Sequence, residues 1–210
     1  MKIKKVATLC SRAGRYRLFD KVDQAGVVTQ WLGDGSAIYP LLGAPMLDED
    51  SLCAVFDITE KKKENISILH EEMPQTVNTN DIFRGDFHMD TGRVSICYDG
   101  ATILPLRAKE GIVFIQEKYL EPLEDEGDLL ELYERKFPNG EPYVAVKAGM
   151  MLRAIICTYK VNEEFASLLE TIAYGCRKGL EKNSPKTDET QESFFRQAKG
   201  EEADRENEEG

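Results

Sequence analysis

Two nearly identical phrases organise this chain: DGSAIYPL at Asp34–Leu41 and DGATILPL at Asp99–Leu106. Aspartate followed by glycine tolerates the positive-φ positions of a tight hairpin turn. A proline after an apolar pair ends ladder pairing at a sheet edge. Each phrase therefore predicts a turn followed by an edge strand. A metal or phosphate role for Asp34 and Asp99 is the less favoured interpretation, because no second carboxylate or lysine lies at useful spacing.

The first phrase is embedded in an alternation of helix and strand signals. Apolar residues at helical spacing predict a helix over 2–13 that Gly14 ends. A hairpin is predicted over 15–34. A second helix of about three turns is predicted over 46–58, with Asp48 as its N-cap, and a strand follows over 64–72.

The second phrase lies in a similar order of segments. A strand is predicted over 111–120, an amphipathic helix over 127–137 and a hairpin over 140–161. A C-terminal helix over 162–182 has Asn162 as its N-cap. Two matches in the same order favour an internal repeat over chance similarity.

The fold class predicted from this order is α+β, with mostly antiparallel sheets and about four helices. The chain is expected to consist of two similar units, produced by tandem duplication, over residues 1–90 and 91–183. Residues 184–210 form an acidic segment of low hydrophobicity. Such a segment cannot bury enough apolar surface to offset its ordering entropy, so a disordered or weakly helical tail is predicted.

Composition and length indicate a globular protein, with 41% hydrophobic and 31% charged residues among 210. No apolar run reaches the roughly 20 residues that cross a bilayer, and the N-terminus lacks the apolar core of a signal peptide. A cytoplasmic protein without membrane contact is therefore predicted. The cysteines are widely spaced and are predicted to be reduced, mostly buried thiols. They are Cys10, Cys53, Cys97, Cys157 and Cys176.

No stretch carries a catalytic, metal-binding or nucleotide-binding signature. His70 and His88 have no partner pattern and are interpreted as surface or turn residues. The acids at 48–50 suit the first turn of a helix, and the lysines at 61–63 suit the end of one. The prediction is therefore a non-enzyme with no catalytic residue, no metal and no cofactor.

The uneven charge is the feature with most functional content. The net charge is −11, yet residues 1–17 contain no acid. Positive potential over this segment would attract phosphates, so its cations are the candidate DNA-binding residues. They are Lys2, Lys4, Lys5, Arg12, Arg15 and Arg17. The alternative is that acids from elsewhere in the fold neutralise this face.

Several phrases carry a resemblance to a known group: QWLGDGSAIYPLLGAPMLDEDSLCAVFDI, VSICYDG, KYLEPL and PYVAVKAGMMLRAII. The sequence resembles uncharacterised proteins of bacterial prophages and conjugative elements over residues 1 to about 182. This resemblance implies a mobile-element context and supplies no activity. The element order also resembles a domain of the DNA sliding clamps, which are acidic proteins with basic helices facing DNA. The units here are shorter than clamp domains, and no clamp motif matches residue by residue.

Two hypotheses follow for function. The first is a non-enzymatic, DNA-associated accessory protein, a sliding-clamp-like processivity factor of a mobile element, with duplex DNA and replication or host proteins as partners. The second is an acidic interaction or scaffold module, of inhibitor or DNA-mimic type, that does not bind DNA. A homo-oligomer is expected.

Overall fold

The computed structural model describes residues 1–91 and 94–183, which divide into one compact unit over Met1–Lys160 and a second unit from Val161 onward. The fold is α+β, with one large sheet of 11 strands and five helices in the described residues. All strand pairs are antiparallel except β1 with β4. The predicted class and the predominance of antiparallel pairing are confirmed. The predicted tail over 184–210 lies outside the described residues.

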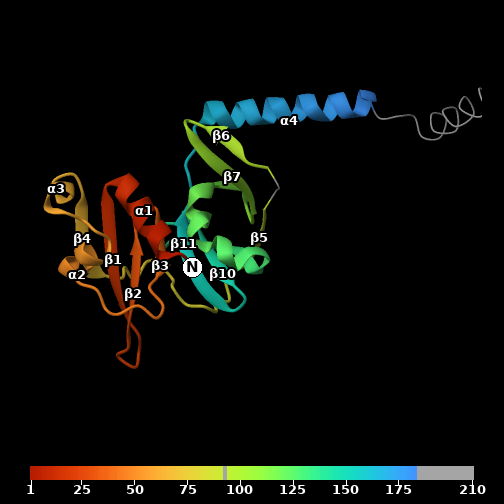
Figure 1. Ribbon diagram of the computed structural model, residues 1–210. Coiled ribbons are helices and arrows are strands. Elements are labelled where there is room, and N and C mark those ends of the chain that lie inside the picture. The colour runs from red at the N-terminus through yellow and green to blue at the C-terminus, as the bar shows by residue number, and fades with distance from the viewer. Residues whose placement is uncertain (92–93, 184–210) are drawn as a thin grey trace, which may run out of the picture. The chain divides into compact units, whose positions relative to one another are not determined.

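The strand order along the sheet is β4-β1-β2-β3-β11-β10-β9-β5-β7-β6, and β8 pairs with β7 (Figure 1). The strands are β1 (Arg15–Val22), β2 (Val28–Gly33), β3 (Ala37–Pro40), β4 (Ser67–Glu72), β5 (Phe87–Thr91), β6 (Ile96–Tyr98), β7 (Ala101–Ala108), β8 (Gly111–Gln116), β9 (Leu130–Lys136), β10 (Pro142–Ala148) and β11 (Met151–Cys157). The helices are α1 (Ile3–Ala13), α2 (Glu49–Val55), α3 (Glu60–Lys63), the 3-10 segment η1 (Glu117–Leu129) and α4 (Glu163–Asn183). Strands β3 and β11 join the first and second halves of the sequence within one sheet.

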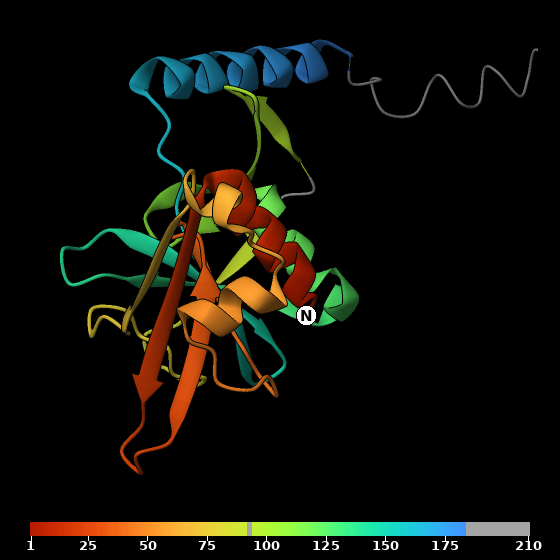
Figure 2. The same cartoon turned by 60° about the vertical axis from the view of Figure 1, so that its left-hand side comes forward.

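The first helix forms as its sequence predicts. Val6, Leu9 and Cys10 on one side of α1 are buried in the main core. Gly14 ends the helix in the left-handed conformation at φ +64°, and its N–H donates to the carbonyls of Cys10 and Ser11. Figure 2 shows α1 lying between the α2–α3 segment and η1 on one face of the sheet.

The second helix also begins as predicted. Asp48 accepts a hydrogen bond from the Ser51 N–H, and Ser51 accepts one from the Asp48 N–H, which makes a reciprocal cap. Helix α2 is shorter than the predicted three turns, because Phe56 caps it after seven residues and Asp57 turns the chain at φ +52°.

The two repeated phrases make different turns. Asp99 and Gly100 both have positive φ, 47° and 72°, in a two-residue hairpin between β6 and β7. In the first phrase only Gly35 has a positive φ, of 90°. The Asp34 carboxylate accepts hydrogen bonds from the N–H groups of Ser36 and Ala37. The phrases therefore share a turn signal but not a turn type.

The prediction of edge strands after these turns is wrong. Strand β3 lies between β2 and β11, and β7 pairs with β5, β6 and β8. Each proline lacks a partner on one side of its strand only, since Pro40 is in register with Trp31 of β2 and Pro105 with Phe114 of β8. Pro40 follows the residues that pair with β11, and Pro105 lies between the β6-paired and β5-paired stretches of β7.

The predicted helix over 127–137 is also wrong, since this segment forms β9. The strand pairs with both β10 and β5. Leu132 packs in the main core, whereas Tyr133 and Phe137 pack against a second cluster around Trp31 and Tyr143. A strand with apolar residues on both faces has no clear period of two, and its apolar residues can match a helical spacing by accident.

The C-terminal helix α4 belongs to the second unit, which starts at Val161. Asn162 caps it, because its Oδ1 accepts the Phe165 N–H at 2.8 Å, as the sequence predicts. Throughout the described residues, no helix combines the length and apolar character needed to span a bilayer.

Candidate functional site

Two of the six candidate DNA-binding residues are neutralised by acids of η1. Lys2 Nζ lies 2.7 Å from Asp125 Oδ1, and Lys5 Nζ lies 2.5 Å from Glu124 Oε2. The hydrogen bond from Lys2 lowers the pKa of Asp125, and the same bond raises the pKa of Lys2. The alternative of neutralisation by distant acids therefore holds for this end of α1.

Lys4 and Arg12 lie elsewhere on α1, beside a groove of about 370 Å³. The groove lies between α1 and the segment from Val55 to Ile66, and Lys62 of α3 lines its other side. Thr8 and Ser11 add hydroxyl groups. Within the described residues, none of these three cations has a carboxylate oxygen within 4.0 Å.

The floor of this groove is apolar and well supported. Tyr16 is 2% exposed, its hydroxyl donates to the Ala7 carbonyl at 3.1 Å, and its ring stacks with Phe56 at a centroid distance of 6.4 Å. Ile58 is buried beside them. Asp57 also lines the groove, and its carbonyl accepts a hydrogen bond from Lys62 Nζ at 3.1 Å. Cationic side chains at the rim of an apolar floor suit contact with a phosphate group.

Arg15 and Arg17 do not share this surface. Side chains alternate between faces along a strand. Tyr16 and Leu18 of β1 pack in the main core under α1, whereas Phe19 packs in the cluster on the opposite face. Arg15 and Arg17 lie four and two residues before Phe19, so they share its face of β1. They are therefore on the opposite side of the strand from Tyr16. The predicted basic face is thus divided among three places.

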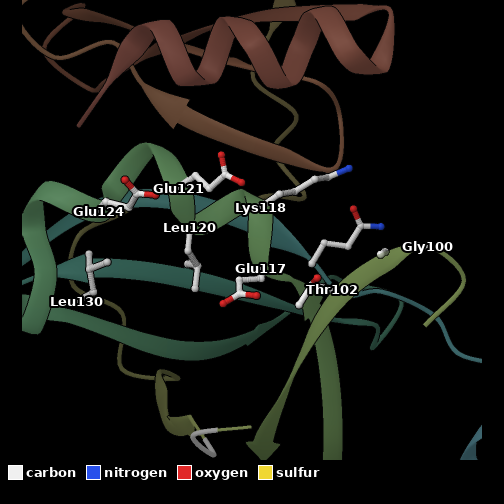
Figure 3. Close-up of a pocket in the computed structure, with 10 residues that line it drawn as sticks. Gly100, Thr102, Glu117, Lys118, Leu120, Glu121, Glu124 and Leu130 are labelled. Atoms are coloured by element: carbon white, nitrogen blue, oxygen red, sulfur yellow. The ribbon is translucent and has the colours of Figure 1, made fainter. Parts of the chain in front are cut away.

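A second hollow lies between η1 and the start of β7, and sequence reasoning missed it. Its volume is about 550 Å³. Figure 3 shows Glu117, Lys118 and Glu121 of η1 around it, with Thr102 on the β7 side. Glu124 lines it too and is the acid that pairs with Lys5. Carboxylates outnumber cations here, so the hollow suits a positively charged group better than a phosphate. The described residues contain no group of three side chains arranged to hold a metal ion.

Asp34 has a structural position. It is 2% exposed, and its Oδ2 accepts the Tyr119 hydroxyl at 2.9 Å. Burial raises the pKa of Tyr119 to about 12, and the nearby Asp34 carboxylate adds to this effect. The hydrogen bond ties η1 to the turn of the first phrase. The sequence holds no signal for a pair separated by so many residues.

The histidines and cysteines form no arrangement for nucleophilic catalysis in the described part of the chain. His70 Nε2 lies 2.9 Å from Asp20 Oδ2 on neighbouring strands, and His88 is exposed on β5. All five cysteines are free, but only Cys10 and Cys53 are buried, so the prediction of mostly buried thiols is wrong. Burial raises the pKa of Cys10 to about 12, which keeps that thiol protonated.

Comparison with known proteins adds no assignment. No family model, no curated protein and no solved structure matches this chain. The resemblances to mobile-element proteins and to sliding clamps therefore stay predictions.

Proposed function

We propose that this protein is a non-enzymatic accessory protein that associates with duplex DNA through the groove between α1 and α3. The observation that carries the proposal is the convergence of Lys4, Arg12 and Lys62 on one groove, where none of the three is ion-paired with a carboxylate of the described residues. Lys2 and Lys5 contribute less, because η1 acids already hold them.

The overall acidity of the chain is consistent with this role. A net charge of −11 repels a polyanion from most of the surface. Local cations can still bind phosphates, because charges beyond a Debye length of about 8 Å at physiological salt are screened. Such a surface would contact the DNA backbone and carry no base specificity.

The test is the affinity for a random-sequence duplex across a salt series. The variant Lys4→Gln/Arg12→Gln/Lys62→Gln removes the three cations, and each lost phosphate contact should reduce the slope of log K against log salt by about 0.9. The control variant Arg84→Gln/Arg107→Gln/Lys109→Gln makes the same charge change at exposed residues outside the groove. Equal effects of both variants, or no binding of the wild type at low salt, would refute the proposal.

We also infer, as a finer hypothesis, that the two halves derive from a duplicated, clamp-like unit of a mobile-element protein. The matching order of hairpin, Asp-Gly turn and proline-containing strand supports the hypothesis. The strand β9, where the first half has α2, weakens the correspondence. An experimental structure in which the two halves superpose over these three elements is the expected result, and halves that do not superpose would argue against it.

A second candidate function is an acidic protein-interaction module that does not bind DNA. The observation that favours it is the apolar surface of α4, where Leu168 is 54% and Ile172 is 51% exposed. A DNA mimic would displace DNA from a basic DNA-binding protein. The variant Lys4→Gln/Arg12→Gln/Lys62→Gln should displace DNA with the same efficiency as the wild type. Loss of displacement in the groove variant would exclude this candidate.

A further inference from the structure

The helix α4 has an apolar side that its own unit leaves exposed. Leu168 and Ile172 are about half exposed, at 54% and 51%. They are four residues apart, so they share one face of the helix. Gly175 and Cys176 continue that face one turn later. Adjacent exposed apolar side chains of this kind mark interaction surfaces in soluble proteins.

The charges of α4 are divided along its length. Glu163, Glu164 and Glu170 lie in the N-terminal half, whereas the C-terminal half carries three cations, Arg177, Lys178 and Lys182, against one acid, Glu181. Two copies aligned in parallel would place like charges together. Two copies aligned antiparallel would place each acidic half against a basic half. Charge complementarity therefore selects a second copy of this helix, in antiparallel orientation, as the partner.

We propose that α4 pairs with α4 of a second copy in an antiparallel helix pair, which makes the protein a homodimer. In this pair Leu168 packs against Ile172 of the partner subunit, on both sides of a two-fold axis. Gly175 lies in the same seam and allows a close approach of the two backbones. The inference is independent of the proposed DNA association, because the α1 groove and α4 share no residue.

The flanking charges fit the same register. Glu164 and Lys178 are 14 residues apart, two heptads, so they lie on the same flank of the apolar face. With Leu168 opposite Ile172, Glu164 lies within reach of Lys178 of the partner subunit, and the two-fold axis repeats the pair. In the single chain Lys178 Nζ lies 4.7 Å from the Tyr174 ring centroid, so its charge already lies beside the helix surface. Glu170 lies two residues before Ile172, and Arg177 lies five residues after it. Both spacings place the side chain on the side of the helix away from the seam.

Sedimentation equilibrium of the full chain, with circular dichroism to verify helix content, tests the pairing. A reversible dimer is expected for the wild type, and Ile172→Glu should be monomeric. A monomeric wild type, or a dimer that Ile172→Glu leaves intact, would overturn the proposal. A wild type that dimerises only after deletion of residues 184–210 would also overturn it, because the chain's own segment would then be the occupant.

Charge exchange tests the orientation and remains informative if Ile172→Glu disturbs the helix. Lys178→Glu should weaken the dimer about tenfold, and the double variant Glu164→Lys/Lys178→Glu should restore it to within about threefold. The matched control is Arg177→Glu, which makes the same change away from the seam and should leave the dimer within about threefold. Failure of the double variant to restore the dimer would refute the antiparallel register.

Oxidative crosslinking separates antiparallel from parallel pairing. Cys176 lies six residues from the centre of the proposed pair, so the two copies are twelve residues, or about 18 Å, apart along the axis. Disulfides require Cα atoms within about 7 Å. In a Cys97→Ser background, no Cys176 crosslink between subunits is therefore expected. Rapid formation of that crosslink would indicate parallel pairing and overturn the proposal.

Discussion

Arg135 and Asp86 form a two-point ion pair in which the arginine side chain is 0% exposed and the aspartate side chain 9% exposed. Arg135 Nε donates to Asp86 Oδ1 at 2.6 Å and Nη2 donates to Oδ2 at 3.1 Å. Arg135 also donates to the carbonyls of Asn78 and Asn80, and Lys147 pairs with the same carboxylate. This network holds the segment before β5 on the sheet face opposite α1.

The first prediction concerns the loss of that carboxylate charge. Asp86→Asn keeps the shape of the side chain but leaves Arg135 and Lys147 buried without a counter-ion. Breaking one member of a buried pair costs about 3–5 kcal/mol, so a loss of about 3 kcal/mol in the free energy of unfolding is expected. Asp128→Asn, at an exposed residue, should change it by less than about 0.5 kcal/mol. Urea unfolding measures both, and equal effects would contradict the prediction.

The second prediction is the pH window of this pair. Burial disfavours the charged form of Asp86, but hydrogen bonds from Arg135 and Lys147 outweigh burial and lower its pKa. A lowered pKa in the folded state contributes stability above the unfolded value of about 3.9, and this stability is lost as pH falls through the folded value. The difference in unfolding free energy between wild type and Asp86→Asn should stay constant from about pH 5 to 8 and shrink below about pH 4. A difference that shrinks above pH 5 would contradict this assignment.

The parts of the fold that the sequence predicted are those set by local chemistry. The end of α1 at Gly14 and the Asp48 cap of α2 each depend on residues within one turn of the chain. The strand β9 depends on burial from two sides, which only the folded sheet supplies. The hairpin turns were predicted, but the strands after them lie inside the sheet. The distant strand β11 pairs with β3, and β8, the next strand in the chain, pairs with the side of β7 that β5 and β6 leave open.

The candidate site was predictable only in its residue types. The absence of acids from residues 1–17 directed attention to α1. The neutralisation of Lys2 depends on Asp125, more than a hundred residues later, and no local pattern indicates that pair. Lys62 was interpreted as part of a lysine run at a helix end, yet it lies across the groove from Arg12 because α3 packs beside α1.

The third prediction concerns Gly33, at the end of β2. A Cβ atom there would lie 1.7 Å from the Ala37 carbonyl oxygen, a backbone atom of the turn that Asp34 begins. Gly33→Ala must therefore displace the turn and β3, and a loss of more than about 4 kcal/mol or failure to fold is expected. Gly140→Ala has open space around its Cβ but a φ of +86°, so it should cost only about 1 kcal/mol. Thermal unfolding of the two variants makes the comparison, and similar losses would contradict the steric argument.

The fourth prediction is the order in which the thiols react. The thiolate is the reactive form, so both exposure and pKa determine the rate. Cys97 and Cys176 are exposed and should react first with a disulfide reagent. Cys157 is half-buried, and burial followed by the Asp34 and Glu141 carboxylates raises its pKa, so it should react more slowly. Cys10 and Cys53 should react only when the chain unfolds.

Mass spectrometry of labelled peptides measures these rates one thiol at a time. Raising the protein concentration should lower the labelling rate of Cys176 and leave that of Cys97 unchanged, because only Cys176 lies beside the proposed seam of α4. The variants Cys97→Ser and Cys176→Ser each remove one of the two fast labelling reactions and so show which thiol gives which rate. Fast labelling of Cys10 in the folded protein would contradict its burial under α1, since its side chain is 0% exposed and its pKa is about 12.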